Sequence, residues 1–293
     1  MSRILITGAN GFLGSFITKL MVMYHEVTIV EKCAGIYNRI SDVVSKLNVY
    51  DFDTYDLEKI FAENKFDVII HTATDYGRDI NRNQDQITTN LLFPVDLVQI
   101  AIKHKVRTFI NTDTFFNNNE LNYKYLGSYT LTKKHLNEWL AFFSAKIQVV
   151  NMKLQHIYGP TDSQLKFVMH MINSMTDNVS ELDITKGEQK RDFIYIEDVA
   201  QAFKKVVDNL NSFEEGFSTI EVGTGNSITI KEFLNLIHKL TNSKTKLNYG
   251  ALPYREGEIM DSIANIQRLN NLGWYPEVKL KEGLQKIINQ SNK

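Results

Sequence analysis

Little in this chain points to a secreted, membrane-bound or nucleic-acid-binding protein. Only one of its 293 residues is a cysteine, Cys33, so no disulfide can form within the chain and a reducing compartment is the expected location. Lys and Arg together number 33 and Asp and Glu number 34, a balance that creates no field to attract nucleic acid or an anionic membrane. No apolar run approaches the ~20 residues that a membrane span needs.

Targeting and metal-binding signals are also missing from the sequence. Strand-like sequence begins at Arg3, so no signal peptide is expected, and we expect a cytoplasmic protein. His, Cys and Asp form no cluster with ligand spacing, so no metal site is expected. With 43% hydrophobic and 23% charged residues, the composition is typical of one large α/β unit or two closely joined lobes.

Apolar, β-branched runs alternate with segments of helical spacing through the first half of the chain. This alternation predicts an α/β fold with a doubly wound parallel sheet of the Rossmann type. The expected strands are Arg3–Thr7, Glu26–Glu31, Asp67–His71, Arg107–Asn111 and Ile147–Leu154. The expected helices are Phe12–Met23, Thr54–Asn64, Asn90–Lys103 and Leu131–Ser144.

Three glycines with the spacing G-x-x-G-x-x-G follow the first expected strand. Gly8 allows the tight turn, Gly11 allows the backbone to approach a diphosphate, and Gly14 allows the next helix to pack against the strand. The N-terminus of that helix then faces the phosphates with unpaired N–H groups and the positive end of its dipole. The motif predicts a binding site for NAD(P)(H).

The residues after the second strand leave NAD and NADP both open. Glu31 ends that strand, where a carboxylate can accept hydrogen bonds from the adenosine ribose of NAD. Lys32 and Arg39 stand near it, and either could meet the 2′-phosphate of NADP instead. The other residues expected at the cofactor are Phe12, Leu13, Asp51, Phe52 and Ala73.

The strict alternation of strands and helices weakens after about residue 155. We therefore expect an NAD(P)-binding Rossmann domain over residues 1–155 and a smaller C-terminal lobe, mainly for substrate, over residues 156–293. Strand-like Asp192–Ile196 and Phe217–Val222 predict that residues 190–225 return to the first domain.

Tyr129 and Lys133 form the candidate catalytic pair. They stand four residues apart, which places them one turn from each other on one face of a helix. An ammonium beside a phenol lowers the pKa of the phenol, so Tyr129 is expected to exchange a proton with a carbonyl during hydride transfer. Lys133 is also expected to bond the nicotinamide ribose, and Thr112, at the end of an apolar strand, to polarise the reacting oxygen.

With these motifs in place, the chain resembles the extended short-chain dehydrogenases/reductases of the nucleotide-sugar-modifying group, from Gly8 to Trp274. Beyond the glycines, Thr112 and the Tyr-Lys pair, the resemblance includes Arg191–Val199 and Tyr254–Glu258. It implies that the guanidinium groups of Arg191 and Arg255 bind the diphosphate of a nucleotide sugar, which suits their planar geometry.

The resemblance carries two further implications. Lys166 and Phe167 are expected near the nucleotide end of the substrate. Members of the family pair through two helices, so a homodimer is expected through Leu91–Ile102 and Leu131–Phe143.

The run Thr112-Asp113-Thr114 bears on the reaction. Nucleotide-sugar 4,6-dehydratases carry Thr-Asp-Glu here, and their acid and base expel water. Thr114 cannot act as a base near neutral pH, so dehydration is disfavoured. Asp113 and Thr114 are expected to contact the substrate.

The amino-acid sequence is most similar to the CDP-abequose and CDP-paratose synthase branch of the family at residues 154–160, 166–167 and 187–192. That branch implies NADPH-dependent reduction of a CDP-linked 3,6-dideoxy-4-keto sugar, in deoxysugar biosynthesis for O-antigen or other polysaccharide. A 4-epimerase with tightly bound NAD is the alternative, ahead of a 4,6-dehydratase or a non-catalytic dinucleotide-binding protein. The nucleotide base, the sugar and the choice between NAD and NADP stay open.

Overall fold

The structure is a computed structural model that describes residues 1–32, 36–77, 83–117 and 126–291; Cys33 lies outside these residues. The chain divides into two compact units. The first unit contains residues 1–117, 126–153 and 200–220. The second contains residues 154–199 and 221–293.

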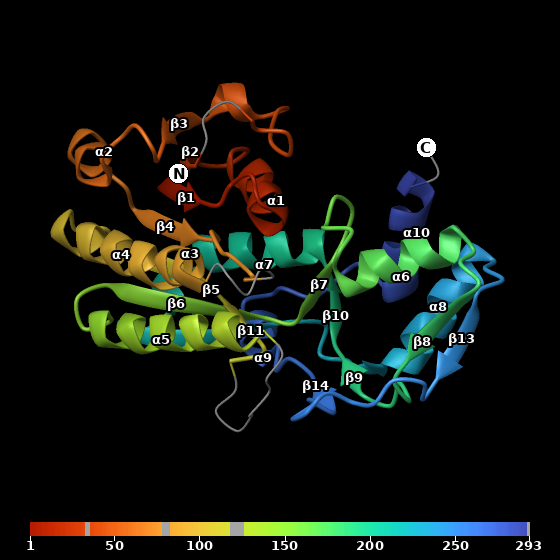
Figure 1. Ribbon diagram of the computed structural model, residues 1–293. Coiled ribbons are helices and arrows are strands. Elements are labelled where there is room, and N and C mark those ends of the chain that lie inside the picture. The colour runs from red at the N-terminus through yellow and green to blue at the C-terminus, as the bar shows by residue number, and fades with distance from the viewer. Residues whose placement is uncertain (33–35, 78–82, 118–125, 292–293) are drawn as a thin grey trace. The chain divides into compact units, whose positions relative to one another are not determined.

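A seven-stranded sheet forms the centre of the first unit, with strand order β11-β6-β5-β4-β1-β2-β3 (Figure 1). The pairs β1/β2, β1/β4, β2/β3 and β4/β5 are parallel, as the alternating pattern predicted. The strands are β1 (Arg3–Thr7), β2 (Glu26–Glu31), β3 (Asn48–Asp51), β4 (Val68–His71), β5 (Thr108–Thr114), β6 (Gln148–Leu154) and β11 (Phe217–Val222).

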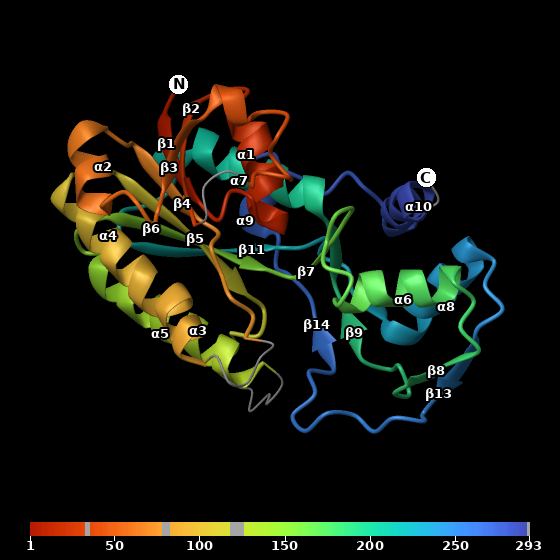
Figure 2. The same cartoon turned by 45° about the horizontal axis from the view of Figure 1, so that its top comes forward.

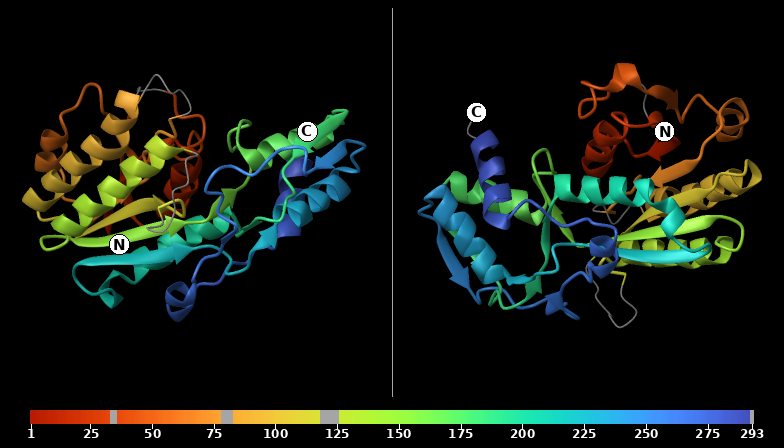
Figure 3. Two further views of the ribbon diagram at one scale, coloured as in Figure 1. Left: turned by 60° about the horizontal axis from the view of Figure 1, so that its bottom comes forward. Right: turned by 180° about the vertical axis from the view of Figure 1, so that it is seen from behind.

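Helices cover both faces of this sheet, which makes it the doubly wound Rossmann type expected from the sequence. Figures 1 and 2 show α2, α4 and α5 together on one face and α1 on the other, and Figure 3 shows the same layers from two further sides. The helices are α1 (Phe12–Met21), α2 (Leu57–Glu63), α3 (Asn83–Ile87), α4 (Phe93–Lys103), α5 (Gly127–Phe143) and α7 (Ile196–Asp208). Shorter helical turns are a π-helical turn at Thr88–Leu92 and 3₁₀ turns at Val44–Lys46 and Leu210–Ser212.

Burial on both faces explains why the central strands are continuous apolar runs. Ile4, Leu5 and Ile6 of β1 and Ile69 and Ile70 of β4 are fully buried. Their side chains alternate between the two helical layers, so each layer receives apolar side chains from the sheet. The ends of these strands are thereby held in fixed positions.

Two element boundaries differ from the prediction in ways that affect the site. Helix α5 begins at Gly127 rather than Leu131, so Tyr129 lies in its first turn. Strand β5 runs to Thr114 rather than ending at Asn111, because polar side chains near its end find partners inside the unit. The sequence pattern placed these polar residues in a turn, since hydrophobicity alone does not reveal buried amide partners.

The second unit contains three small sheets, with orders β10-β7, β12-β9-β14 and β13-β8, and helices of which α6 and α8 contact each other. Its strands are β7 (His156–Tyr158), β8 (Glu181–Ile184), β9 (Lys190–Arg191), β10 (Phe193–Tyr195), β12 (Ile228–Thr229), β13 (Lys246–Tyr249) and β14 (Asp261–Ser262). Its helices are α6 (Phe167–Thr176), α8 (Ile230–Thr241), α9 (Gln267–Asn271) and α10 (Leu280–Ser291).

One of the two strands expected to rejoin the large sheet does so, and the other does not. Phe217–Val222 is β11 at the edge of that sheet. The prediction for Asp192–Ile196 was wrong, because β10 pairs in parallel with β7. The buried Asp192 carboxylate accepts hydrogen bonds from the backbone N–H groups of Thr224 (2.8 Å), Gly225 (3.1 Å) and Ala264 (3.2 Å), which tie this strand to loops of the second unit.

Within the described ranges, no helix is both long enough and apolar enough to span a membrane.

Candidate active site

The glycine turn joins β1 to α1 in the first unit, and its backbone is too close-packed for side chains at two positions. Gly8 has φ +74°, and a Cβ there would lie 2.5 Å from the Ala73 nitrogen. A Cβ at Gly14 would lie 1.9 Å from the Gly8 oxygen. The N–H of Gly11 donates to the same Gly8 oxygen at 3.0 Å. The turn therefore requires glycine at positions 8 and 14.

The N-terminus of α1 fits an anionic group. Gly11 is its N-cap, no side chain caps the first N–H groups, and no acidic residue lies in the first turn, which includes Phe12 and Leu13. The backbone N–H groups at a helix N-terminus and the helix dipole together favour a phosphate at this position. These residues fit the diphosphate of a dinucleotide.

Glu31 lies beside this turn. Its carboxylate accepts a hydrogen bond from the Asn10 N–H (3.2 Å), and burial raises its pKa above the usual range. Arg39 is held on the same turn, since its N–H donates to the Asn10 side-chain oxygen (3.0 Å) and its guanidinium to the Asn10 carbonyl (3.4 Å). Lys32 is exposed. A carboxylate and two cations near one turn leave the choice between NAD and NADP open.

Asp51 and Phe52, two of the residues expected at the cofactor, lie at the end of β3. The Asp51 carboxylate accepts a hydrogen bond from the Asp53 N–H at 3.0 Å. The Phe52 ring is partly exposed and meets the edge of Phe93 at 5.0 Å. An open groove of about 450 Å³ adjoins Phe52 and is lined by Phe52, Tyr55, Asp56, Leu57, Asp96, Gln99 and Ile100.

Tyr129 is almost fully buried at the start of α5, with 5% of its surface exposed. Its ring stacks on that of Tyr76, with centroids 4.9 Å apart and planes at 24°. The side chains of Thr114 and Tyr76 both act on the pKa of its hydroxyl, which Thr114 lowers and Tyr76 raises. Burial raises the pKa of Tyr129 well above its ordinary value. The expectation that Lys133 lowers this pKa was wrong, because desolvation of the phenolate is the larger effect.

Lys133 lies one turn further along α5, and 2% of it is exposed. Its ammonium donates a hydrogen bond to the backbone carbonyl of Thr112 at 2.8 Å. Burial lowers the pKa of Lys133 to about 8, and the negative charge of Asp113 partly opposes this shift. The lysine thus binds the end of β5 and carries a charge that is sensitive to pH near neutrality.

The two threonines at the end of β5 have different surroundings. The Thr112 hydroxyl is buried and has no hydrogen-bond partner among the described residues. The Thr114 side chain lowers the pKa of the Tyr129 hydroxyl, and its own oxygen accepts the Phe116 N–H at 3.3 Å. Thr114 therefore acts on the phenol. Positions 112 and 114 lie on one face of a strand, so the sequence pattern did not distinguish them.

The Asp113 carboxylate faces the interior of the first unit. It accepts hydrogen bonds from the amides of Asn137 (2.6 Å), Asn151 (2.9 Å) and Asn117 (3.3 Å). These three amides satisfy a buried charge close to Lys133 and the phenol. The sequence analysis did not identify these three amides. Only Asn137 could have been found from the sequence, because it stands four residues after Lys133 on the same helix.

The second unit contains the other residues expected to bind substrate. Arg191 is buried; its guanidinium pairs with Glu258 and donates to the Ile259 carbonyl and to the Lys190 carbonyl (2.7 Å). Arg255 is exposed in the loop between β13 and β14. 

Two further residues of this unit flank the start of α6. The Lys166 ammonium pairs with the Asp162 carboxylate at 2.8 Å. Phe167 is 41% exposed, and its ring stacks on Phe233 with centroids 6.1 Å apart.

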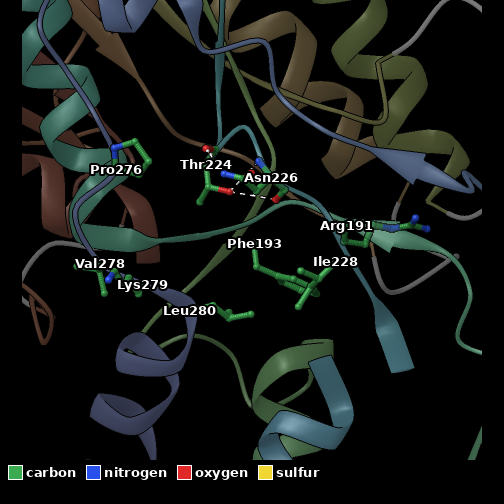
Figure 4. Close-up of a pocket in the computed structure, with 9 residues that line it drawn as sticks. All are labelled: Arg191, Phe193, Thr224, Asn226, Ile228, Pro276, Val278, Lys279 and Leu280. Atoms are coloured by element: carbon green, nitrogen blue, oxygen red, sulfur yellow. Dashed lines mark hydrogen bonds between the residues drawn. The ribbon is translucent and has the colours of Figure 1, made fainter. Parts of the chain in front are cut away.

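A cavity of about 260 Å³ lies within the second unit. Figure 4 shows the Arg191 side chain running away from the other residues that line it, so its guanidinium does not face this space. The lining residues are Arg191, Phe193, Thr224, Asn226, Ile228, Pro276, Val278, Lys279 and Leu280.

No group of three or more His, Cys, Asp or Glu side chains that could hold a metal occurs in residues 1–32, 36–77, 83–117 and 126–291. The site is instead a dinucleotide turn and a Tyr-Lys pair on the same unit.

Comparison with known proteins shows the family to which the chain belongs. The model described as "NAD dependent epimerase/dehydratase family" matches residues 4–223. Among curated proteins, the CDP-abequose synthases of Salmonella muenchen and Salmonella typhimurium are 34% and 29% identical over 98% and 97% of this chain, and over 97% of each relative. Among solved structures, the UDP-glucose 4-epimerase of Thermotoga maritima with UDP-glucose matches with a TM-score of 0.81 and 23% identity, covering 99% of this chain and 98% of that chain. The chain therefore belongs to the NAD dependent epimerase/dehydratase family of extended short-chain dehydrogenases/reductases, and it is a nicotinamide-dependent enzyme of the nucleotide-sugar group.

Proposed function

We propose that this enzyme reduces the 4-keto group of a nucleotide-linked deoxy sugar, with a CDP-linked sugar as the first substrate to test. The identity to two CDP-abequose synthases over nearly the whole chain supports this reaction and places it in deoxysugar biosynthesis. The fold alone does not choose between reduction and epimerisation, because one scaffold supports several reactions.

The observation that carries the proposal is the threonine at position 114, whose side chain acts on the pKa of the Tyr129 hydroxyl. In the family's dehydratases this position is a glutamate, which acts in the expulsion of water. A threonine has no accessible charge at neutral pH and can only donate or accept a hydrogen bond. The neighbouring Asp113 carboxylate is occupied by three amides. The site is therefore suited to proton donation beside a carbonyl rather than to dehydration.

Tyr129 is also suited to supply the proton that reduction of a ketone requires. Like an ordinary tyrosine its phenol is protonated at neutral pH, and burial raises its pKa further.

The remaining roles follow from the chain's own residues. A reduced nicotinamide dinucleotide, when bound, supplies the hydride. Lys133 holds the end of β5 and binds the ribose next to the nicotinamide, while the hydroxyls of Thr112 and Thr114 polarise the reacting carbonyl. Gly8, Gly11 and Gly14 hold the diphosphate of the cofactor. Other parts of the cofactor are contacted by Phe12, Leu13, Glu31, Lys32, Asp51, Phe52 and Ala73.

Substrate recognition is proposed for the lobe over residues 156–293. Arg191 and Arg255 bind the diphosphate of the nucleotide sugar, and Lys166 and Phe167 contact its nucleotide end. Thr114, at the end of β5, is proposed on the side of the sugar, whereas the Asp113 carboxylate, also expected there from the sequence, faces the interior of the first unit. Arg191 is already oriented by Glu258, so its guanidinium loses little further freedom on binding.

A homodimer through α4 and α5 is also proposed. Leu131, Trp139 and Phe142 of α5, and Leu92 at the end of the π-helical turn before the adjacent α4, are about half or more exposed. The Trp139 ring meets Phe142 and Phe143 at 6.0 Å and 5.8 Å, so these aromatic side chains form one apolar patch. Exposed patches of this kind mark protein interfaces. A second copy of the chain is the occupant that we propose.

The reaction is tested by cofactor stoichiometry. A panel of CDP-, UDP- and dTDP-linked 4-keto sugars is mixed with NADH or NADPH, and absorbance at 340 nm is followed together with product formation. We expect one reduced nicotinamide to be consumed for each alcohol formed. Product formed with no net loss of reduced nicotinamide, and NAD retained through purification, would establish the 4-epimerase instead.

The proton donor is tested by the substitution Tyr129→Phe, which keeps the buried ring and removes only the hydroxyl. Turnover is expected to fall by a factor on the order of 10²–10⁴. Binding of NADH or NADPH, followed by fluorescence, is expected to stay close to wild type. Wild-type turnover in this variant would remove Tyr129 from the proposed chemistry.

The low pKa of Lys133 predicts a pH dependence of stability. Between about 8 and the ordinary value of 10.5, the unfolded chain holds a proton on this lysine that the folded chain has lost. The free energy of unfolding therefore rises with pH in this window, by about 2 kcal/mol between pH 7.5 and 9.5. Urea unfolding of wild type and Lys133→Met at both pH values measures this difference, and exposed Lys134→Met is the control. Parallel pH curves for wild type and Lys133→Met would contradict the prediction.

The dimer is tested by Phe142→Glu, because Phe142 is 71% exposed and the substitution leaves the core of the monomer intact. Light scattering after size-exclusion chromatography should show a dimer for wild type and a monomer for the variant. Tyr275→Glu, which changes an aromatic residue of similar exposure (61%) in the second unit, should stay dimeric. A monomeric wild type, or a dimeric Phe142→Glu, would exclude this interface.

A further inference from the structure

We propose that His71 and Asn111 hold one buried water molecule between them, inside the first unit. This water completes a row of hydrogen bonds that runs from Thr7, the residue before the glycine turn, to Asp113 near the end of β5. The site goes beyond the proposed reaction, since it needs neither cofactor nor substrate and is the same for a reductase and an epimerase.

The sheet places three polar side chains next to one another. Thr7 of β1 is paired with His71 of β4, and His71 is paired with Asn111 of β5. Paired residues of neighbouring parallel strands direct their side chains to the same face of the sheet, and such strands lie ~4.8 Å apart. The three residues are 1%, 0% and 0% exposed, so the row is closed to solvent.

Two buried atoms of this row, His71 Nε2 and Asn111 Oδ1, have no hydrogen-bond partner in the part of the chain that the structure describes. Buried polar atoms are normally paired, either with the protein or with an ordered water, because an unpaired one is costly. The two residues are in register on adjacent strands. One water molecule between them can therefore serve both atoms.

The amides around Asp113 fix the role of the Asn111 oxygen. The Asp113 carboxylate accepts hydrogen bonds from the NH₂ groups of Asn137 (2.6 Å) and Asn151 (2.9 Å). A carboxylate has no proton to give, so the oxygens of these two amides remain as acceptors. The Asn111 NH₂ group donates to them at 3.2 Å and 2.7 Å. The other end of the Asn111 amide is thereby left as an acceptor that requires a donor.

The surroundings of the two atoms favour a neutral ligand. Burial and the positive charge of Lys133 lower the pKa of His71 well below its ordinary value, so the ring is neutral. The charge of Lys133 also disfavours a metal cation beside this ring, and the Asn111 oxygen, as an acceptor, disfavours an anion. A water molecule both donates and accepts, so it can pair with the Asn111 oxygen and with His71 Nε2 in either tautomer of the ring.

The water joins two groups of hydrogen bonds that the side chains alone leave separate. In one group, the Thr7 hydroxyl lies 2.8 Å from His71 Nδ1. In the other, Asn111 is linked through the asparagine amides to Asp113. With the water in place, one polar network crosses β1, β4, β5 and β6. A satisfied buried network makes the surrounding structure more rigid, so it holds together the strand ends that carry the glycine turn and the Lys133 partner Thr112.

A high-resolution crystal structure of the wild-type chain tests the site directly. We expect one ordered water within about 3.2 Å of both His71 Nε2 and Asn111 Oδ1. A direct hydrogen bond between these two atoms, or no electron density between them, would overturn the proposal.

A second measurement counts buried waters in solution by the magnetic relaxation dispersion of ¹⁷O in water. His71→Phe keeps a planar ring among Phe93 and Phe109 but removes both nitrogens, and it should lower the count by one. His170→Phe, at an exposed position of α6, is the matched control and should leave the count unchanged. Equal counts in wild type and His71→Phe would contradict the site. If His71→Phe does not fold, the wild-type crystal structure decides alone.

Discussion

The phenol of Tyr129 and the ammonium of Lys133, both on α5, are buried. The polar side chains around them stabilise that burial. Tyr129 and Lys133 are 5% and 2% exposed. Each loses hydration and must find partners within the fold. Tyr129 stacks on Tyr76, and Lys133 donates to the Thr112 carbonyl. The same burial raises the pKa of the phenol and brings the pKa of the lysine to about 8.

Asparagine side-chain amides supply many of the hydrogen bonds around these buried groups. Asn137 and Asn151 bind the Asp113 carboxylate, and Asn111 links them through hydrogen bonds of 3.2 Å and 2.7 Å. Asn90 bonds with both the N–H and the carbonyl of Asp75, in the segment after β4. An amide can donate and accept at once without a charge of its own, so it joins a carboxylate or a backbone segment to a helix without adding a desolvated ion.

A single residue type at the end of β5 separates the proposed reaction from dehydration. Where the family's dehydratases have a glutamate, Thr114 offers a neutral hydroxyl, which lowers the pKa of Tyr129. Because Asp113 is satisfied by amides, neither side chain is available as a free base. The catalytic pair and the glycine turn are common to several reactions of the family, so the choice between these reactions depends on such neighbouring positions.

The sequence by itself determined the Rossmann sheet, the glycine turn and the Tyr-Lys pair, because each depends on local spacing: apolar runs of strand length, glycines at a strand–helix junction, and two residues one helical turn apart. It indicated the family for the same reason. The tertiary structure was needed to show that burial raises the pKa of Tyr129 and that β10 pairs outside the large sheet. It was also needed to show that Tyr76 stacks on Tyr129 and that Asn90 bonds with Thr132. These features depend on desolvation and on contacts between segments far apart in the chain, such as Asn90 with Thr132, and neither leaves a pattern in the local sequence.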